Sequence, residues 1–142
     1  MRDDLLDPRG VLLHESAGSR EEAIRRCGRA LVDVGAVAEP YIEAMLERER
    51  SISTYVGEGV AIPHGTAASK EDVRRDAICV VRFPDGVDWD GERVTVCVGI
   101  AAKDDGHVPL LAALAEILLD PDRARTLREA TEVHQVTKEL TS

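Results

Sequence analysis

Residues 94–100 read VTVCVGI, and this run is the clearest structural signal in the chain. Its side chains are almost all β-branched or small and apolar, with no alternation between apolar and polar positions. A strand covered on only one face alternates apolar and polar side chains, so this run is typical of a central strand with both faces covered. We therefore expect it to lie inside a sheet that is flanked by helices.

Helix signals lie on both sides of this run. A capping box at residues 19–22, SREE, predicts the start of a helix, and Gly35 stands where a helix-ending glycine belongs. Pro40 suits the first turn of a second helix. The apolar stripe of the first helix recurs at helical spacing: Ile24, Cys27, Leu31 and Val34. A third helix is expected at 108–119, and we expect it to be buried because Glu116 is its only charge.

The remaining elements are short. We predict short strands within 53–62, a polar helix at 69–75, a strand at 77–81, turns at 84–86 and 90–91, and helices at 122–130 and 132–140. Strands and helices that are interleaved in this way predict an α/β protein, a single-domain layered fold with one mixed β-sheet flanked by helices. Since the chain has no repeat, low-complexity tract or linker, residues 1–142 are expected to form one domain.

Composition excludes several classes of protein. The chain has 142 residues and is 44% hydrophobic, which is enough to bury a core. Its net charge of -9 argues against binding nucleic acid or an anionic membrane surface, since both need a basic surface. No apolar run approaches the roughly 20 residues that span a bilayer, and the N-terminus does not resemble a signal peptide. We therefore expect a cytoplasmic protein.

The three cysteines are widely spaced and odd in number, so they do not predict a disulfide framework. Cys79 and Cys97 lie in apolar runs and are interpreted as small core residues. Their spacing does not indicate a metal site, and we expect none.

Four histidines are candidates for chemistry. We interpret His14 and His134 as solvated surface residues. His64 lies in IPHGT, residues 62–66, just after a predicted strand. Pro63 fixes its own φ, and Gly65 allows a sharp turn, so His64 would be presented at a strand end, where α/β folds place their sites.

The groups around His64 could bind an anion. The backbone amides that follow it, from Gly65 onward, and the Thr66 hydroxyl are candidate anion ligands. On the pattern alone, this interpretation and that of a histidine in an ordinary turn are about equally supported.

Two other residues are weaker candidates. His107 lies at the start of the apolar helix, where the positive end of the helix favours a neutral imidazole that could donate one N–H to a phosphoryl oxygen. It could equally well only cap the helix. Arg48 lies in the charge run 47–50, which is usually a solvated helix end, but a guanidinium there could grip a phosphoryl group with two parallel hydrogen bonds.

Three blocks of sequence carry a family resemblance: MLERE at 45–49, STYVGEGVAIPHGT at 53–66 and GIAAKDDGH at 99–107. They strongly resemble the active-site and second-histidine blocks of enzyme IIA domains of the mannitol/fructose class, in the bacterial sugar phosphotransferase system (PTS). The match covers nearly the whole chain in order, and the run from 57 to 66 is its most specific part. Within the class, the chain looks closer to the mannitol branch than to the fructose or nitrogen-regulatory branches.

The resemblance implies a phosphoryl relay. His64 would accept a phosphoryl group, by the family pattern on Nε2, from the carrier protein HPr and pass it to a cysteine of a IIB domain. The membrane component IIC would then import the sugar, and both IIB and IIC would lie on separate chains. His107 matches the second, unphosphorylated histidine and Arg48 the arginine beside the site. No cofactor and no Mg²⁺ is implied, because this transfer asks mainly for positioning and charge stabilisation.

Two alternatives remain open. The chain could be a regulatory module, with the same fold and the same phosphorylation of His64, whose output is binding to a regulator or transporter. It could also be an acidic interaction domain in which His64 is structural.

Overall fold

The predicted central strand is β5 (Glu92–Ala101), which lies in the middle of a five-stranded sheet. The computed structural model describes residues 3–103 and 107–141. The strand order is β1-β4-β5-β3-β2, with bounds β1 (Leu6–Leu12), β2 (Tyr55–Gly57), β3 (Val60–Ala61) and β4 (Ala77–Trp89). β4 and β5 pair antiparallel, as do β2 and β3, whereas β1–β4 and β3–β5 are parallel. The sheet is therefore mixed, as predicted.

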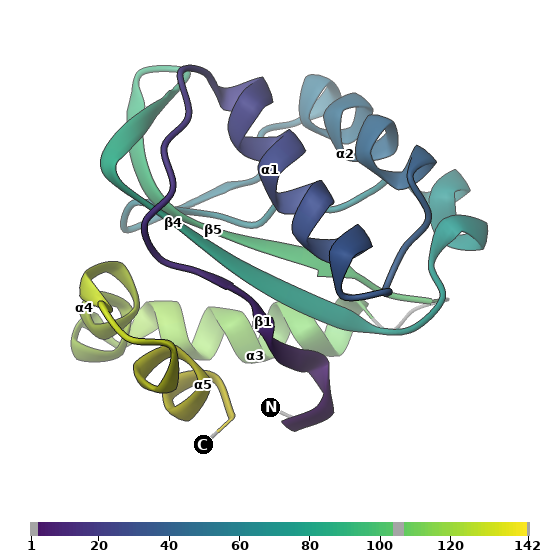
Figure 1. Cartoon of the computed structure of the whole chain (residues 1–142). Helices are drawn as coiled ribbons and strands as arrows, with labels where there is room; N and C mark the ends of the chain where they lie inside the picture. Colours follow the sequence, from purple (N-terminus) through teal and green to yellow (C-terminus); the bar gives the residue numbers. More distant parts are fainter. Residues whose placement is uncertain (1–2, 104–106, 142) are drawn as a thin grey trace.

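Helices cover both faces of this sheet (Figure 1). One layer contains α1 (Arg20–Asp33) and α2 (Pro40–Ser51), with a short 3₁₀ helix, η2 (Ala67–Asp72), beside α2. The other contains α3 (His107–Leu119), α4 (Pro121–Glu129) and α5 (Val133–Thr141). A second 3₁₀ helix, η1 (Asp3–Leu5), precedes β1. This architecture confirms the predicted α/β fold class.

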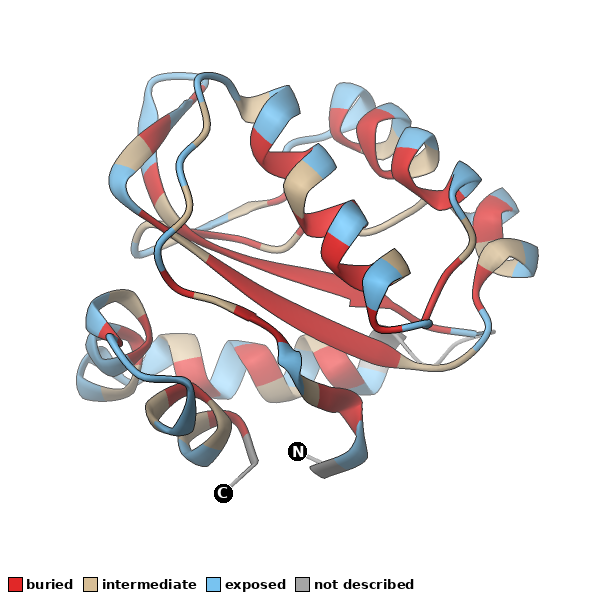
Figure 2. Cartoon of the chain, in the orientation of Figure 1, coloured by how far each residue is buried: buried red, intermediate tan, exposed pale blue. Residues whose placement is uncertain are grey.

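Alternate side chains of the central strands enter two separate cores. Val96, Val98 and Ile100 pack toward α3, α4 and α5, whereas Cys97 and Ala101 pack toward α1 and α2. Successive side chains of a strand point to opposite faces, so a run that is apolar at every position supplies both cores. Figure 2 shows the result as a continuous buried band along β4 and β5.

The start and end of α1 follow the sequence signals. The Ser19 hydroxyl accepts a hydrogen bond from the Glu22 amide at 3.2 Å, and the Glu22 carboxylate accepts one from the Gly18 amide at 2.8 Å. In a standard capping box the Glu22 carboxylate would accept from the Ser19 amide; here it accepts from the amide one residue earlier. Gly35 has φ of 77°, a conformation that favours glycine and that ends the helix.

Two predictions about strands and turns were incomplete or wrong. β1 was not predicted, because Pro8 and Gly10 are turn residues; an edge strand tolerates them, since it need not donate every amide. The turn predicted at 84–86 lies inside β4 as an irregularity between Arg82 and Val87. Both ends of that irregularity pair with β5, so the chain bulges instead of reversing. The turn at 90–91 is confirmed.

Two helix predictions also needed correction. The helix predicted at 69–75 is η2 at 67–72, because the Ser69 amide and hydroxyl both donate to the Thr66 carbonyl, at 3.1 and 2.6 Å, and wind the chain earlier. The helix at 108–119 exists as α3 but is not buried all round, since Leu119 is 83% exposed. Its buried side chains include Leu110, Leu114 and Ile117, which form one stripe facing the sheet.

Among residues 3–103 and 107–141, none of the helices combines the length and the apolar character that a membrane crossing requires.

The three cysteines are free and buried, in agreement with their interpretation as small core residues. Cys79 and Gly99 lie opposite each other on β4 and β5, under α1. A Cβ atom at position 99 would lie only 2.6 Å from Cys79 Sγ, and 3.5 Å from Cys27 Cβ. The absence of a side chain at 99 therefore lets the helix lie close to the sheet.

We predict that Gly99→Ala lowers the free energy of unfolding by about 1–3 kcal/mol, the usual cost of overpacking a core. Urea denaturation would measure it. Because the clash is with Cys79 Sγ, the double variant with Cys79→Ala should lose less stability than the sum of the two single losses. Strict additivity would show that the clash lies elsewhere.

Candidate functional site

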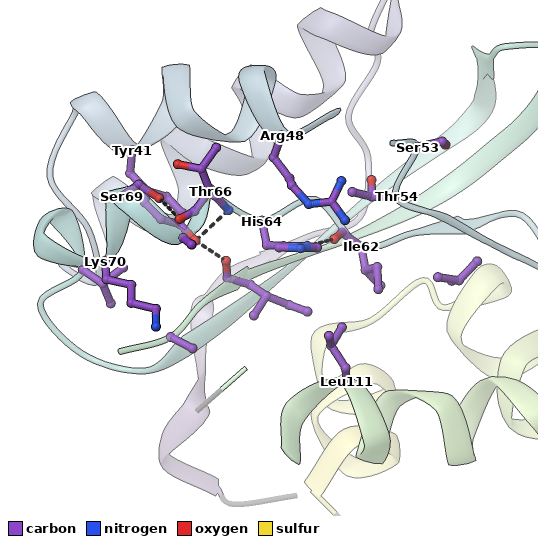
Figure 3. Close-up of a pocket in the computed structure, with 16 residues that line it drawn as sticks. Tyr41, Arg48, Ser53, Thr54, Ile62, His64, Thr66, Ser69, Lys70 and Leu111 are labelled. Atoms are coloured by element: carbon purple, nitrogen blue, oxygen red, sulfur yellow. Dashed lines mark hydrogen bonds between the residues drawn. The ribbon is translucent and has the colours of Figure 1, made fainter. Parts of the chain in front are cut away.

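A cavity of about 600 Å³ opens where the parallel strands β3 and β5 end. Its walls come from several elements: Tyr41 and Arg48 on α2, the segment after β3 that contains His64, the end of β5 at Ile100, and Leu111 on α3. Figure 3 shows Tyr41, Arg48 and His64 around one space, with Leu111 facing them from α3. The carboxyl ends of parallel strands are where α/β folds place ligands.

His64 is held against the central strand. The Ile100 amide donates to the Pro63 carbonyl at 2.9 Å, and His64 pairs with Ile100 as an isolated parallel bridge. The imidazole is half-buried and lines the cavity. It is therefore fixed in position yet reachable, as a nucleophilic side chain must be.

One hydrogen bond of the His64 ring determines which of its two nitrogens carries the proton. Nδ1 of His64 lies 2.9 Å from the Ile62 carbonyl oxygen (Figure 3). A carbonyl oxygen only accepts, so Nδ1 must carry the proton and donate it. In the neutral ring, Nε2 then keeps its lone pair and is the nucleophilic atom.

Arg48 comes from the end of α2 into the same cavity. Its Nη1 donates to the Ile52 carbonyl at 2.7 Å. Among the described residues it forms no ion pair, and its side chain is directed toward His64 in Figure 3. Its neighbours Glu47 and Arg50 are exposed, whereas Arg48 is half-buried, so Arg48 differs from these residues of the same charge run.

Gly65 is enclosed by Tyr41. The Gly65 amide donates to the Tyr41 hydroxyl at 2.9 Å, and that hydroxyl donates to the Ile100 carbonyl at 2.8 Å. A Cβ at position 65 would lie 2.5 Å from the Tyr41 ring and 2.4 Å from Ser69 Oγ, so only glycine fits without a shift. The Gly65 amide, which we expected to face an anion, is therefore engaged by Tyr41.

Tyr41 is a buried residue that links Gly65 to Ile100, and the sequence analysis did not identify it. Burial raises the pKa of its hydroxyl to about 12, so it stays protonated at neutral pH and can donate to Ile100. Its spacing contained a signal, because Tyr41 lies four residues before Met45 and so shares the inward face of the helix.

The other predicted residues lie as follows. Thr66 lines the cavity and precedes η2, and its side chain makes no capping hydrogen bond there. His107 is the first residue of α3, but its side chain, like residues 104–106, lies outside the described part of the structure. His14 and His134 are exposed, as predicted.

Comparison with known proteins identifies the family. The family model described as "Phosphoenolpyruvate-dependent sugar phosphotransferase system, EIIA 2" matches residues 4–142. The chain belongs to this family. It is thus a PTS enzyme IIA, a phosphoryl-transfer component, as its resemblance implied.

Relatives of this IIA chain cover almost its full length. It is 42% identical over 139 residues to the mannitol-specific phosphotransferase enzyme IIA component of Staphylococcus aureus, which covers 96% of each chain. It is similar to the solved structure of IIA mannitol from Escherichia coli, with a TM-score of 0.86 at 33% identity, covering 94% of this chain and 97% of that one. The IIA chain in the complex of Escherichia coli IIA and phosphorylated IIB for mannitol has a TM-score of 0.88 at 32% identity, covering 96% and 98%.

We predict that Tyr41→Phe lowers the free energy of unfolding by about 1–3 kcal/mol, because the Gly65 amide and the Ile100 carbonyl lose their partner. The difference in the free energy of unfolding between wild type and Tyr41→Phe should narrow above pH 10. An unfolded tyrosine ionises near pH 10 and the folded Tyr41 near pH 12, so the wild-type advantage is complete below 10 and is lost as the pH rises toward 12.

Urea denaturation at several pH values would measure this difference. The control is Tyr55→Phe, at the only other tyrosine of the chain, since Tyr55 does not contact the loop of His64 through its hydroxyl. A gap between wild type and Tyr41→Phe that stays constant up to pH 12 would contradict the assigned pKa.

Proposed function

We propose that the chain carries a phosphoryl group on Nε2 of His64, accepts it from phospho-HPr and gives it to the cysteine of a IIB protein. The observation that carries this proposal is the 2.9 Å hydrogen bond between Nδ1 of His64 and the Ile62 carbonyl. That bond supports Nε2 as the attacking atom, in a cavity that also contains a guanidinium.

The proposed transfers exchange one P–N bond for another and then for a P–S bond. The Nε2 lone pair of His64 attacks phosphorus, the bond to the HPr histidine breaks, and its electron pair returns to that histidine. The phosphorylated ring acquires cationic character while it keeps its Nδ1 proton, and the Ile62 carbonyl stabilises that charge by accepting the proton's hydrogen bond. The thiolate of the IIB cysteine then attacks phosphorus, and His64 becomes neutral again.

Three other residues complete the proposed site. Arg48 neutralises charge on the phosphoryl oxygens, since its guanidinium has N–H groups besides the one that it donates to Ile52. Thr66 supplies a hydroxyl to the same oxygens. His107 donates one N–H; this role rests on the family resemblance and on its position at the start of α3.

The identity of the sugar and of the partners is also part of the proposal. The named relatives are mannitol-specific, and one was solved with a phosphorylated IIB, so we propose mannitol or a related polyol and a IIB protein on a separate chain. Membership of the family supports HPr as the proposed donor. A cytoplasmic location is expected for a partner of HPr.

The proposal predicts that the wild-type chain gains the mass of one phosphoryl group after incubation with phosphoenolpyruvate, enzyme I and HPr. Intact-mass spectrometry at alkaline pH, which preserves phosphohistidine, would measure it. His64→Ala should gain none, whereas His14→Ala, at an exposed histidine outside the cavity, should behave as wild type. A folded wild-type chain that stays unmodified, while a known IIA is phosphorylated in the same mixture, would overturn the relay and favour a binding module.

A second prediction concerns Arg48. Arg48→Lys keeps the charge but removes the forked donor, so transfer from phospho-HPr should slow by roughly 10-fold to 100-fold. Arg50→Lys, at the neighbouring exposed arginine, is the matched control and should have little effect. Rapid-quench measurement of the phosphorylation rate would compare them. Equal rates in the two variants would return Arg48 to the role of a surface charge.

A further inference from the structure

A buried carboxylate lies behind the site and is not used by the relay described above. Glu49, on α2, is only 5% exposed, and it forms no ion pair among the residues that the structure describes. A carboxylate in such a place is costly unless hydrogen bonds replace the lost water. The hydrogen bonds of Glu49 therefore indicate which groups it positions.

Glu49 accepts hydrogen bonds from two residues. Oε2 accepts from the Thr54 amide at 3.0 Å and from Trp89 Nε1 at 3.1 Å, and Oε1 accepts from the Thr54 hydroxyl at 2.5 Å. Thr54 is itself buried and is gripped through both its backbone and its side chain. The carboxylate thus fixes the start of the segment that leads into β2.

Thr54 is connected to the catalytic imidazole by two more hydrogen bonds. The Thr54 carbonyl accepts from the Ile62 amide at 3.0 Å, and the Ile62 carbonyl faces Nδ1 of His64 at 2.9 Å. Because the amide and the carbonyl belong to the same residue, a displacement of Thr54 moves the group that holds the imidazole. The path runs from Glu49 through Thr54 and Ile62 to His64.

We propose that Glu49 is a positioning residue: it holds Thr54 and Ile62 so that the Ile62 carbonyl keeps the proton of His64 on Nδ1 and the lone pair, which attacks phosphorus, on Nε2. This inference rests on the proposed function of His64. The competing explanation is purely structural, with Glu49 only joining α2 to β4 through Trp89.

Two variants at position 49 separate geometry from charge. Glu49→Gln keeps the length of the side chain: its amide oxygen can accept from the Thr54 amide and from Trp89, while its NH₂ group donates to the Thr54 hydroxyl. Glu49→Asp keeps the charge but is one methylene shorter, so it cannot reach both partners. The proposal predicts that the glutamine variant behaves nearly as wild type and that the aspartate variant does not.

The first readout is the tautomer of His64, measured by long-range ¹H–¹⁵N NMR of the imidazoles at a pH where they are neutral, with His64→Ala to assign the signals. Wild type and Glu49→Gln should show Nδ1 protonated and Nε2 unprotonated. Glu49→Asp should shift toward a mixture of tautomers. The second readout is the rate of phosphorylation by phospho-HPr, expected to fall roughly 10-fold to 100-fold in Glu49→Asp and less than about 3-fold in Glu49→Gln.

Trp89→Phe is the control for a structural role. It removes the indole donor to Oε2 and keeps both bonds from Thr54 to the carboxylate. It should lower stability in urea without changing the tautomer of His64. A Glu49→Asp variant that is less stable but keeps the wild-type tautomer and rate would overturn the proposal, as would a Glu49→Gln variant as defective as Glu49→Asp.

The experiment also separates this inference from the proposed function. If wild type is not phosphorylated, the relay fails, but a changed tautomer in Glu49→Asp still establishes that Glu49 positions the ring. If wild type is phosphorylated and the tautomer is the same in all variants, the relay stands and the positioning role of Glu49 is wrong.

Discussion

The backbone amide and carbonyl of Ile100 both take part in hydrogen bonds that hold the loop containing His64. Its amide donates to the Pro63 carbonyl, and its carbonyl accepts from Tyr41, which in turn holds the Gly65 amide. Ile100 is buried and lies near the end of the central strand, which is covered on both faces of the sheet. The residues on either side of His64 are therefore attached to the buried central strand, and a site supported by a strand keeps its geometry better than one on a loop alone.

One helix supplies most of the remaining support. α2 carries Tyr41 and Glu49 on its buried side and Arg48 at the edge of the cavity. Its position is set by close packing on α1, where a Cβ at Gly28 would lie 2.7 Å from the side chain of Ile42. The contacts that build the core of this layer therefore also fix the geometry of the site. A change in the packing of α2 would reach the site through three side chains at once.

The charge that Arg48 brings to the cavity is opposite in sign to the net charge of the whole chain. The net charge is -9, and the arginines on α1 pair with carboxylates, as in Arg26–Glu15 and Arg29–Glu39. Arg48 bonds instead to a backbone carbonyl, so its charge is not neutralised by a carboxylate among the described residues. A cation kept in this way in a half-enclosed cavity suits a dianionic phosphoryl group, which an acidic surface would otherwise repel.

The sequence by itself determined the class of the fold, the central strand and both ends of α1, because short-range patterns encode them. The set of His64, Arg48 and His107 was predicted from the resemblance of contiguous motifs to the family; the structure places His64 and Arg48 at one cavity. The sequence did not reveal β1, whose Pro8 and Gly10 are tolerated only at a sheet edge, or the bulge at 84–86, which depends on pairing with β5. The hydrogen bond of His64 Nδ1 and the buried contacts of Tyr41 and Glu49 became visible only in the tertiary structure. They include the hydrogen bonds from Tyr41 to Ile100 and from Trp89 to Glu49, which join residues 59 and 40 positions apart, and no local pattern specifies which distant partner a buried polar group will meet.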